Sequence, residues 1–141
     1  MKIDYLAGLL GPWSWEPTAG SVILRIFLST ALASIIGYER STKRHSAGMR
    51  TFIIVSLAAT TAAIAQASLA AQGCASPWIT ASVIIGTAML SGYSIFFSSK
   101  GQIKGLTTSA GLWACGIIGA AIGMGLYTAA LVSWAALLCS L

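Results

Sequence analysis

Charged residues are scarce in this chain, and their scarcity excludes a water-soluble domain. Only 8% of the 141 residues are Asp, Glu, Lys or Arg, whereas soluble domains carry about 25%. No charge occurs in the 49 residues between Arg50 and Lys100, or in the 37 residues after Lys104. Because one membrane-spanning helix needs about 20 apolar residues, each of these runs is long enough to cross a bilayer.

Residues that serve enzymes and metal sites are also few. The chain has three acidic residues, one His and three Cys. Cys74, Cys115 and Cys139 form no CxxC pair and are interpreted as small apolar residues. No Ser-His-Asp or Cys-His arrangement, phosphate-binding glycine loop or metal-ligand cluster is present. We therefore predict no enzyme, no cofactor and no metal site; a magnesium cage would have only Glu39 to use.

What the chain does have is long, continuous apolar segments. They do not alternate with period two, and in lipid the backbone must be satisfied within each element, so helices are favoured over a barrel. As one helix the last 37 residues would be about 55 Å long against a hydrocarbon core of about 30 Å. We predict an all-α integral membrane protein with five spans: 20–38, 51–70, 78–97, and two within 105–141 that are divided near residues 123–127.

The loop cations set the expected orientation. Four of them lie between the first two spans and two lie before the fourth span, whereas the loop 71–77 carries none. By the positive-inside rule the basic loops are cytoplasmic, which places the N-terminus outside and the C-terminus in the cytoplasm. Residues 1–19, with Trp13 and Trp15, are predicted to form an extracytoplasmic interfacial segment. The net charge of +5 then indicates contact with anionic headgroups and not with nucleic acid.

Two short patterns recur and indicate an internal repeat. Gly37-Tyr38 is followed 55 residues later by Gly92-Tyr93, and "GMRT" at Gly48 by "GLTT" at Gly105. The repeat would be parallel and would place two helix N-termini together on the cytoplasmic side. Such termini attract anions, and threonine hydroxyls can cap them. We predict an anion or lipid-headgroup site made of Arg50, Thr51, Lys104, Thr107 and Thr108; the alternative is ordinary capping beside surface cations.

Small residues at spacing four predict two helix-packing faces. In the first span Arg25 shares such a stripe with Ser29, Ala33 and Gly37, so Arg25 is an intramembrane charge expected to point toward protein or an outer vestibule. The fourth span has a similar face, which a helix of this chain or of a partner must cover: Gly111, Cys115, Gly119 and Gly123.

Glu39 is the acidic residue placed near a span end on the cytoplasmic side. A carboxylate there is costly unless it is paired, and Arg40 or Arg50 could be its partner. A structural ion pair is one interpretation, and proton or ion handling is the other.

Together these segments resemble the MgtC/SapB family of bacterial inner-membrane proteins. The stretch "GYERSTKRHSAGMRT" is similar to that family's Gly-x-Glu-Arg, basic loop and Ala-Gly-Leu-Arg-Thr pattern, with Met49 in place of Leu. The stretch "KGLTTSAGLW" is similar to its Arg-Gly-Leu-x-Thr-Ala-x-x-Leu-Trp pattern, with Lys104 for Arg and Ser109 for Ala. The matching positions include Glu39, Arg40, Arg50, Thr51, Gly105, Thr108 and Trp113.

The resemblance implies a transmembrane domain over 20–141, and we expect no soluble domain after it. It also implies a role in adaptation to low magnesium, acid or host conditions, an inner-membrane location, and the F-type ATP synthase as a membrane-protein partner. Few intramembrane ligands and many small-residue faces favour modulation of another membrane protein through helix contacts. The alternative is a transporter or channel for Mg²⁺ or another small solute. A homo-oligomer is compatible with either function.

Overall fold

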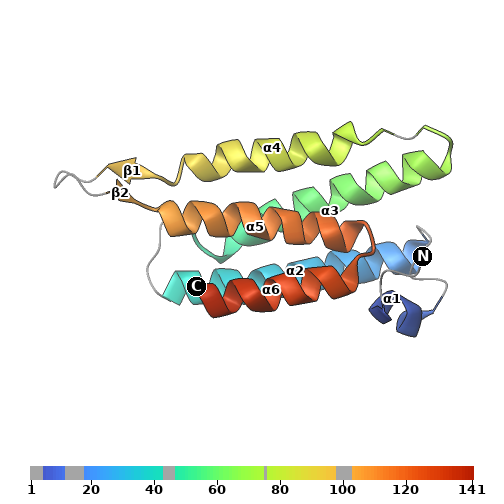
Figure 1. Ribbon diagram of the computed structural model, residues 1–141, viewed down its shortest axis with the longest axis horizontal. Helices are drawn as coiled ribbons and strands as arrows, with labels where there is room; N and C mark the ends of the chain where they lie inside the picture. Colours follow the sequence, from blue (N-terminus) through green and yellow to red (C-terminus); the bar gives the residue numbers. More distant parts are fainter. Residues whose placement is uncertain (1–4, 12–17, 43–46, 75, 98–102) are drawn as a thin grey trace.

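The computed structural model describes all of the chain except residues 1–4, 12–17, 43–46, 75 and 98–102. The described part contains a short helix, five long helices and one pair of two-residue strands (Figure 1). The helices are α1 (Tyr5–Leu10), α2 (Ala19–Thr42), α3 (Met49–Ala71), α4 (Trp78–Gly92), α5 (Leu106–Gly123) and α6 (Tyr127–Ser140). Trp13, Trp15, Lys43, Arg44 and Lys100, which the sequence analysis used, lie outside the described residues.

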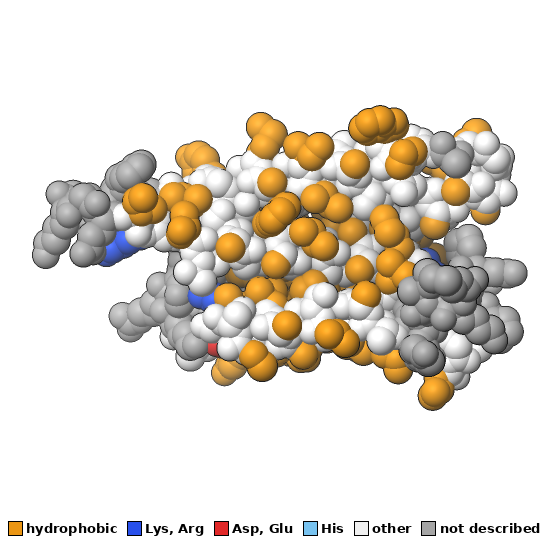
Figure 2. All heavy atoms as spheres, in the orientation of Figure 1, with side chains coloured by type: hydrophobic (Ala, Val, Ile, Leu, Met, Phe, Trp, Pro, Cys, Tyr) orange, Lys and Arg blue, Asp and Glu red, His pale blue; other side chains and the backbone are white. Residues whose placement is uncertain are grey.

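The all-α membrane class is confirmed. Helices α2, α3 and α5 are each long and apolar enough to span a membrane, and α4 and α6 are shorter apolar helices of 15 and 14 residues. Apolar side chains cover the visible face along the whole bundle, while charged atoms are seen only toward its two ends (Figure 2). Large apolar side chains such as Phe27, Ile54 and Met89 are mostly exposed, as expected of a surface that faces lipid.

Consecutive long helices run in opposite directions (Figure 1). Helices α3 and α5 therefore begin at the end of the bundle where α2, α4 and α6 finish. We call this the basic end, because its described cations are Arg40, Arg50 and Lys104. The two hairpins α2–α3 and α4–α5 point the same way, as the repeat predicts.

The third span ends earlier than the sequence predicted. Helix α4 stops at Gly92 instead of Phe97, because Tyr93, Ser94 and Ile95 donate to carbonyls three residues back at 3.0–3.2 Å, a tightening typical of helix ends. Residues 96–97 then form strand β1 (Phe96–Phe97), which pairs antiparallel with β2 (Ile103–Lys104). Gly105 follows with φ +89°, and a Cβ there would overlap the carbonyl oxygen of Ser94, so this turn requires glycine.

The break between the last two spans is confirmed. Helix α5 ends at Gly123 and α6 begins at Tyr127. Gly125 has φ +82°; its N–H donates to Ile122 O at 3.0 Å, and Leu126 N–H donates to Ala121 O at 2.9 Å. These two bonds and the left-handed glycine form a Schellman motif, which explains why a continuous apolar run folds as two helices.

The hydrophobic core lies between α2, α3, α5 and α6. One cluster at the basic end joins Ala33, Ile36, Phe52, Val55, Leu112 and Cys115, and a second joins Leu32, Ile118, Ile122, Tyr127 and Ala130. Trp134 borders both clusters and donates its indole N–H to Leu32 O at 3.0 Å. Helix α4 contributes Val83 and Ile84, which pack against a third cluster of Ala59, Ala63 and Ala120.

Candidate functional site

The small-residue face of α5 is covered by α3 of the same chain. A Cβ added to Gly119 would lie 2.5 Å from Ser56 O, and one added to Gly123 would lie 2.5 Å from Thr60 O. Gly111 faces the ring of Phe52, and Cys115 Sγ lies 3.8 Å from Phe52 O. The sequence left open whether this chain or a partner covers the face; the structure shows that a partner helix cannot use it.

A buried hydroxyl network holds the middle of the bundle. Ser29 Oγ of α2 and Ser56 Oγ of α3 lie 2.9 Å apart, and Thr60 Oγ1 lies 2.7 Å from Ser29 Oγ and 2.9 Å from Gly119 O of α5. All three hydroxyl residues are at most 1% exposed. Interhelical hydrogen bonds of this kind stabilise helix association in lipid, and here they close the space between three helices.

Arg25 points into the protein, as predicted, and not into lipid. It is 1% exposed. Its Nη1 donates to Gly123 O at 2.9 Å and its Nε donates to Tyr127 OH at 3.2 Å. Because the free carbonyls and the negative dipole end lie at a helix C-terminus, the end of α5 is a favourable place for this cation. Arg25 thereby ties α2 to the α5–α6 turn.

The threonine capping that the sequence predicted is wrong. The N-cap residues are Gly48 for α3 and Gly105 for α5, and neither helix has a side-chain cap bond. Gly48 and Gly105 directly precede the first helical residue, so Thr51, Thr107 and Thr108 fall inside the helices. Thr108 is 1% exposed and Thr107 is exposed.

The register of α3 and α5 separates the two halves of the predicted anion site. The close contacts Phe52–Cys115, Ser56–Gly119 and Thr60–Gly123 all join residues 63 positions apart. By the same register Thr51 of α3 is level with residue 114 of α5. Residue 114 lies six residues after Thr108, so Thr51 and Thr108 are about 9 Å apart along the helix axis. The α5 terminus thus extends past the α3 terminus instead of meeting it. Arg50 and Lys104 are both exposed.

Glu39 and Arg40 at the basic end lie in different environments. The side chain of Glu39 is half-buried, and Glu39 is not without an interaction partner. Arg40 is only 1% exposed, yet its Nε and Nη2 have no hydrogen-bond partner in the part of the chain that the structure describes. The expected Glu39–Arg40 pair is therefore not made through these two atoms. Burial of Arg40 was not predicted from the sequence, although Arg40 follows the buried Gly37 by one helical turn.

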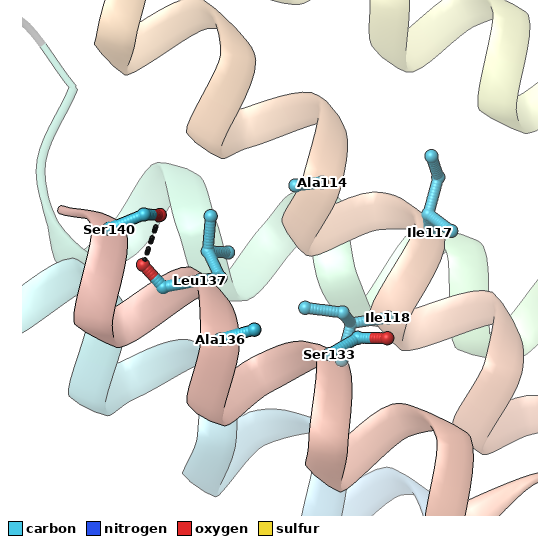
Figure 3. A pocket seen from close by; sticks show the side chains of 7 residues that line it. All are labelled: Ala114, Ile117, Ile118, Ser133, Ala136, Leu137 and Ser140. Carbon is cyan, nitrogen blue, oxygen red and sulfur yellow. Dashed lines mark hydrogen bonds between the residues drawn. The ribbon is translucent and has the colours of Figure 1, made fainter.

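Two grooves flank α5 on the outer surface. The α4–α5 groove has a volume of about 350 Å³ and includes Ser109, Ala110 and the half-exposed Trp113. The α5–α6 groove has a volume of about 400 Å³; its α5 side is Ala114, Ile117 and Ile118, and its α6 side is Ser133, Ala136, Leu137 and Ser140 (Figure 3). Ser140 Oγ donates to Leu137 O at 2.8 Å, so this hydroxyl is satisfied within α6.

No metal centre is found in the described residues, where no three His, Cys, Asp or Glu side chains lie close enough together to hold an ion. The described site features are therefore the interior network, the basic end and the two grooves.

Comparison with known proteins assigns these features to a family. The model of the MgtC family matches residues 26–141, which covers α2 from its third turn onward and all later helices. The chain belongs to the MgtC family. This confirms the resemblance carried by the Glu39–Arg40 and Arg50–Thr51 segments.

Named relatives are similar over most of this chain. Protein MgtC of Brucella abortus (strain 2308) is 31% identical over 121 residues, which is 84% of this chain and 49% of the relative. A protein of Escherichia coli (strain K12) named "Putative magnesium transporter YhiD" is 30% identical over 74% of this chain and 52% of its own length. Protein SapB of Bacillus subtilis (strain 168) is 27% identical over 89% of this chain and 56% of its own.

The chain spans about half the length of the curated relatives that it matches. No solved structure matches it. What the family comparison establishes is therefore the membrane part that these proteins share.

Proposed function

We propose that this chain is a membrane unit of the MgtC type that supports adaptation to low magnesium or to acid and host stress. It does so by modulating another membrane protein through helix contacts. The observation that carries the proposal is the α5–α6 groove. This groove is an apolar depression on the surface, and small residues of α6 lie along one side of it.

The groove suits a transmembrane helix. Ser133, Ala136 and Ser140 of α6 are exposed and lie along one side of it (Figure 3). Small residues let the backbones of neighbouring membrane helices approach closely. The glycine face of α5, in contrast, is occupied by α3. We therefore place the partner contact on α6 and the outer side of α5. By family resemblance the F-type ATP synthase is one candidate partner.

The interior packing supports modulation over transport. Between α2, α3 and α5 the hydroxyls of Ser29, Ser56 and Thr60 are in direct hydrogen-bond contact, and α5 approaches the α3 backbone through Gly119 and Gly123. This arrangement leaves no path for a hydrated ion along the centre of these three helices.

A second candidate function is transport of Mg²⁺ or another ion. It is favoured by the printed name of one relative, the "Putative magnesium transporter YhiD" of Escherichia coli (strain K12). In this chain such a path would have to run outside the α2–α3–α5 interior, for example beside α4. Glu39 at the basic end would then be the carboxylate that meets the ion.

A groove-filling substitution tests the proposed function. Ala136→Leu places a larger side chain in the α5–α6 groove. We expect it to abolish growth support at low magnesium in a strain that depends on this protein, while the variant accumulates in the membrane at the wild-type level. Met89→Leu is the matched control, because Met89 is 76% exposed on α4 and lines neither groove. Normal growth with Ala136→Leu would contradict the proposed contact.

A further inference from the structure

Arg40 differs from the other described cations at the basic end because it is buried. It is 1% exposed, although α2 ends only two residues later at Thr42. Arg50 and Lys104 are exposed. The Nε and Nη2 atoms of Arg40 have no hydrogen-bond partner among the described residues. Since buried charged groups are normally paired and hydrogen-bonded, this position requires an explanation.

The two unpartnered atoms lie on the same edge of the guanidinium group. Nε and Nη2 each direct an N–H outward along this edge, and the two N–H groups are parallel. Two parallel donors match two oxygens of a carboxylate or a phosphate. Arginine commonly uses such a pair of N–H groups to bind an oxyanion through bidentate hydrogen bonds. The edge that lacks a partner is therefore the edge best suited to bind an anion.

The N-terminus of α3 lies close to the last turn of α2, which carries Arg40. Gly37 lies one turn before Arg40 on the buried face of α2, and a Cβ on Gly37 would lie 2.6 Å from Met49 Cα, at the first residue of α3. The first N–H groups of a helix have no acceptor four residues back, and the helix dipole is positive there; in α3 the Thr51 N–H already donates to Gly48 O at 3.1 Å. The N-cap residue is Gly48, which has no side chain to accept from them.

Arg25 provides an internal comparison. It lies on the same buried face of α2 and is equally buried, but its neighbour is the C-terminal end of α5, and it donates to Gly123 O and Tyr127 OH. Arg25 therefore has acceptors within the chain, whereas two guanidinium nitrogens of Arg40 have none among the described residues. A bound anion would accept from Arg40 as Gly123 O and Tyr127 OH accept from Arg25.

We propose that Arg40 and the N-terminus of α3 bind a phosphate-bearing anion at the basic end of the bundle. The phosphate belongs either to a lipid headgroup or to free inorganic phosphate. Arg50, exposed in the first turn of α3, adds positive charge at the rim. The site needs no residue of α5, so it differs from the set predicted by sequence, and it does not depend on the proposed function.

Thermal unfolding of the purified protein in an uncharged detergent tests the site. The probes are short-chain phosphatidylglycerol and sodium phosphate, each compared with sodium chloride at equal ionic strength. We expect at least one probe to raise the unfolding temperature of the wild type, and Arg40→Met to remove that rise. A rise with phosphatidylglycerol alone identifies a headgroup site, and a rise with both identifies phosphate itself as sufficient.

Matched variants separate binding from a structural role. Without a probe, Arg40→Met should unfold at or above the wild-type temperature, since the arginine edge has no partner to lose, whereas Arg25→Met should unfold at a lower temperature. In Arg50→Gln the probe should still raise the unfolding temperature, but by less than in the wild type. Arg40→Lys keeps the charge but loses the paired donors, so it should bind either probe about tenfold more weakly.

Three results would overturn the proposal. The first is that neither probe raises the unfolding temperature of the wild type. The second is that a probe raises the unfolding temperature of Arg40→Met as much as that of the wild type. The third is that, without a probe, Arg40→Met is destabilised as much as Arg25→Met. If Arg40→Met does not fold, wild-type affinity in Arg40→Lys overturns it as well.

Discussion

At the scale of single residues, Arg25 is the clearest case of a charge that the fold satisfies. Its guanidinium donates to the last carbonyl of α5 and to the hydroxyl of Tyr127 on α6. Both partners come from segments about a hundred residues away in sequence. A cation in the apolar part of a membrane bundle is costly, and here the cost is offset by acceptors at a helix end.

Removing these hydrogen bonds should destabilise the bundle. We expect Arg25→Met to lower the free energy of unfolding by about 2 kcal/mol and Tyr127→Phe by about 1 kcal/mol, because hydrogen bonds of charged groups contribute more than neutral ones. Denaturant unfolding in detergent, followed by circular dichroism, measures both. Ile23→Val, at a 69% exposed position on the same helix, should have almost no effect. Wild-type stability of Arg25→Met would refute this role.

Single residues also show the limit of reading a site from sequence. The stripe at spacing four correctly placed Arg25, Ser29 and Gly37 on the buried face of α2. Arg40 continues that face, but the sequence placed it only in the basic loop and as a possible partner of Glu39. Burial of Arg40 depends on how α3 crosses α2 at Gly37, and side-chain spacing within one segment does not contain that crossing.

At the scale of helices, the contact between α3 and α5 determines the architecture. Gly119 and Gly123 let α5 approach the α3 backbone at Ser56 and Thr60. The same approach fixes a register in which α5 starts beyond α3. Close packing of small residues is the main source of helix association where lipid removes the hydrophobic driving force.

Adding a methyl group at this contact should disrupt it. Gly119→Ala and Gly123→Ala would each place a Cβ 2.5 Å from a backbone oxygen of α3, and we expect each to cost about 1–3 kcal/mol through overpacking. Gly86→Ala is the control: a Cβ there has nothing within 4 Å, and alanine is the better helix former by about 1 kcal/mol. Unfolding in detergent compares the three, and equal stability of all would contradict the packing.

The sequence predicted where the helices lie along the chain better than how they are positioned against one another. Spans α2 and α3, and the break before α6, followed from the lengths of the apolar runs; the left-handed Gly125 in the turn was seen only in the structure. The error in α4 arose because Tyr93 to Phe97 are apolar enough to continue a helix, yet pairing of Phe96 with Lys104 uses their backbone instead. The shift between α3 and α5, which separates Thr51 from Thr108 along the bundle axis, could not be predicted because tertiary packing sets it.

At the scale of the whole molecule, the bundle is a membrane unit with a tightly packed interior and apolar grooves outside. The MgtC family model matches residues 26–141, and the matched relatives are about twice as long as the matched segment. We propose that the basic end faces the cytoplasm of a bacterium and that the opposite end faces outward, in the inner membrane.

The orientation can be measured with a native cysteine. Cys74 is exposed and follows α3 at the end opposite the basic end. A membrane-impermeant maleimide should label Cys74 in intact spheroplasts of a Cys139→Ser variant, and Cys74→Ser should remove the signal. Cys115 is buried and should stay unlabelled in both. Labelling of Cys74 only after permeabilisation would reverse the proposed orientation.

Magnesium influx into liposomes tests the central claim most directly. The purified protein, shown to be folded and inserted, is reconstituted under an inward Mg²⁺ gradient with and without a membrane potential, beside a Glu39→Gln variant. The closed packing at Ser29, Ser56 and Thr60 predicts influx no faster than in protein-free liposomes for both proteins. Influx that requires the wild-type protein and falls in Glu39→Gln would contradict the modulator function and establish a transporter.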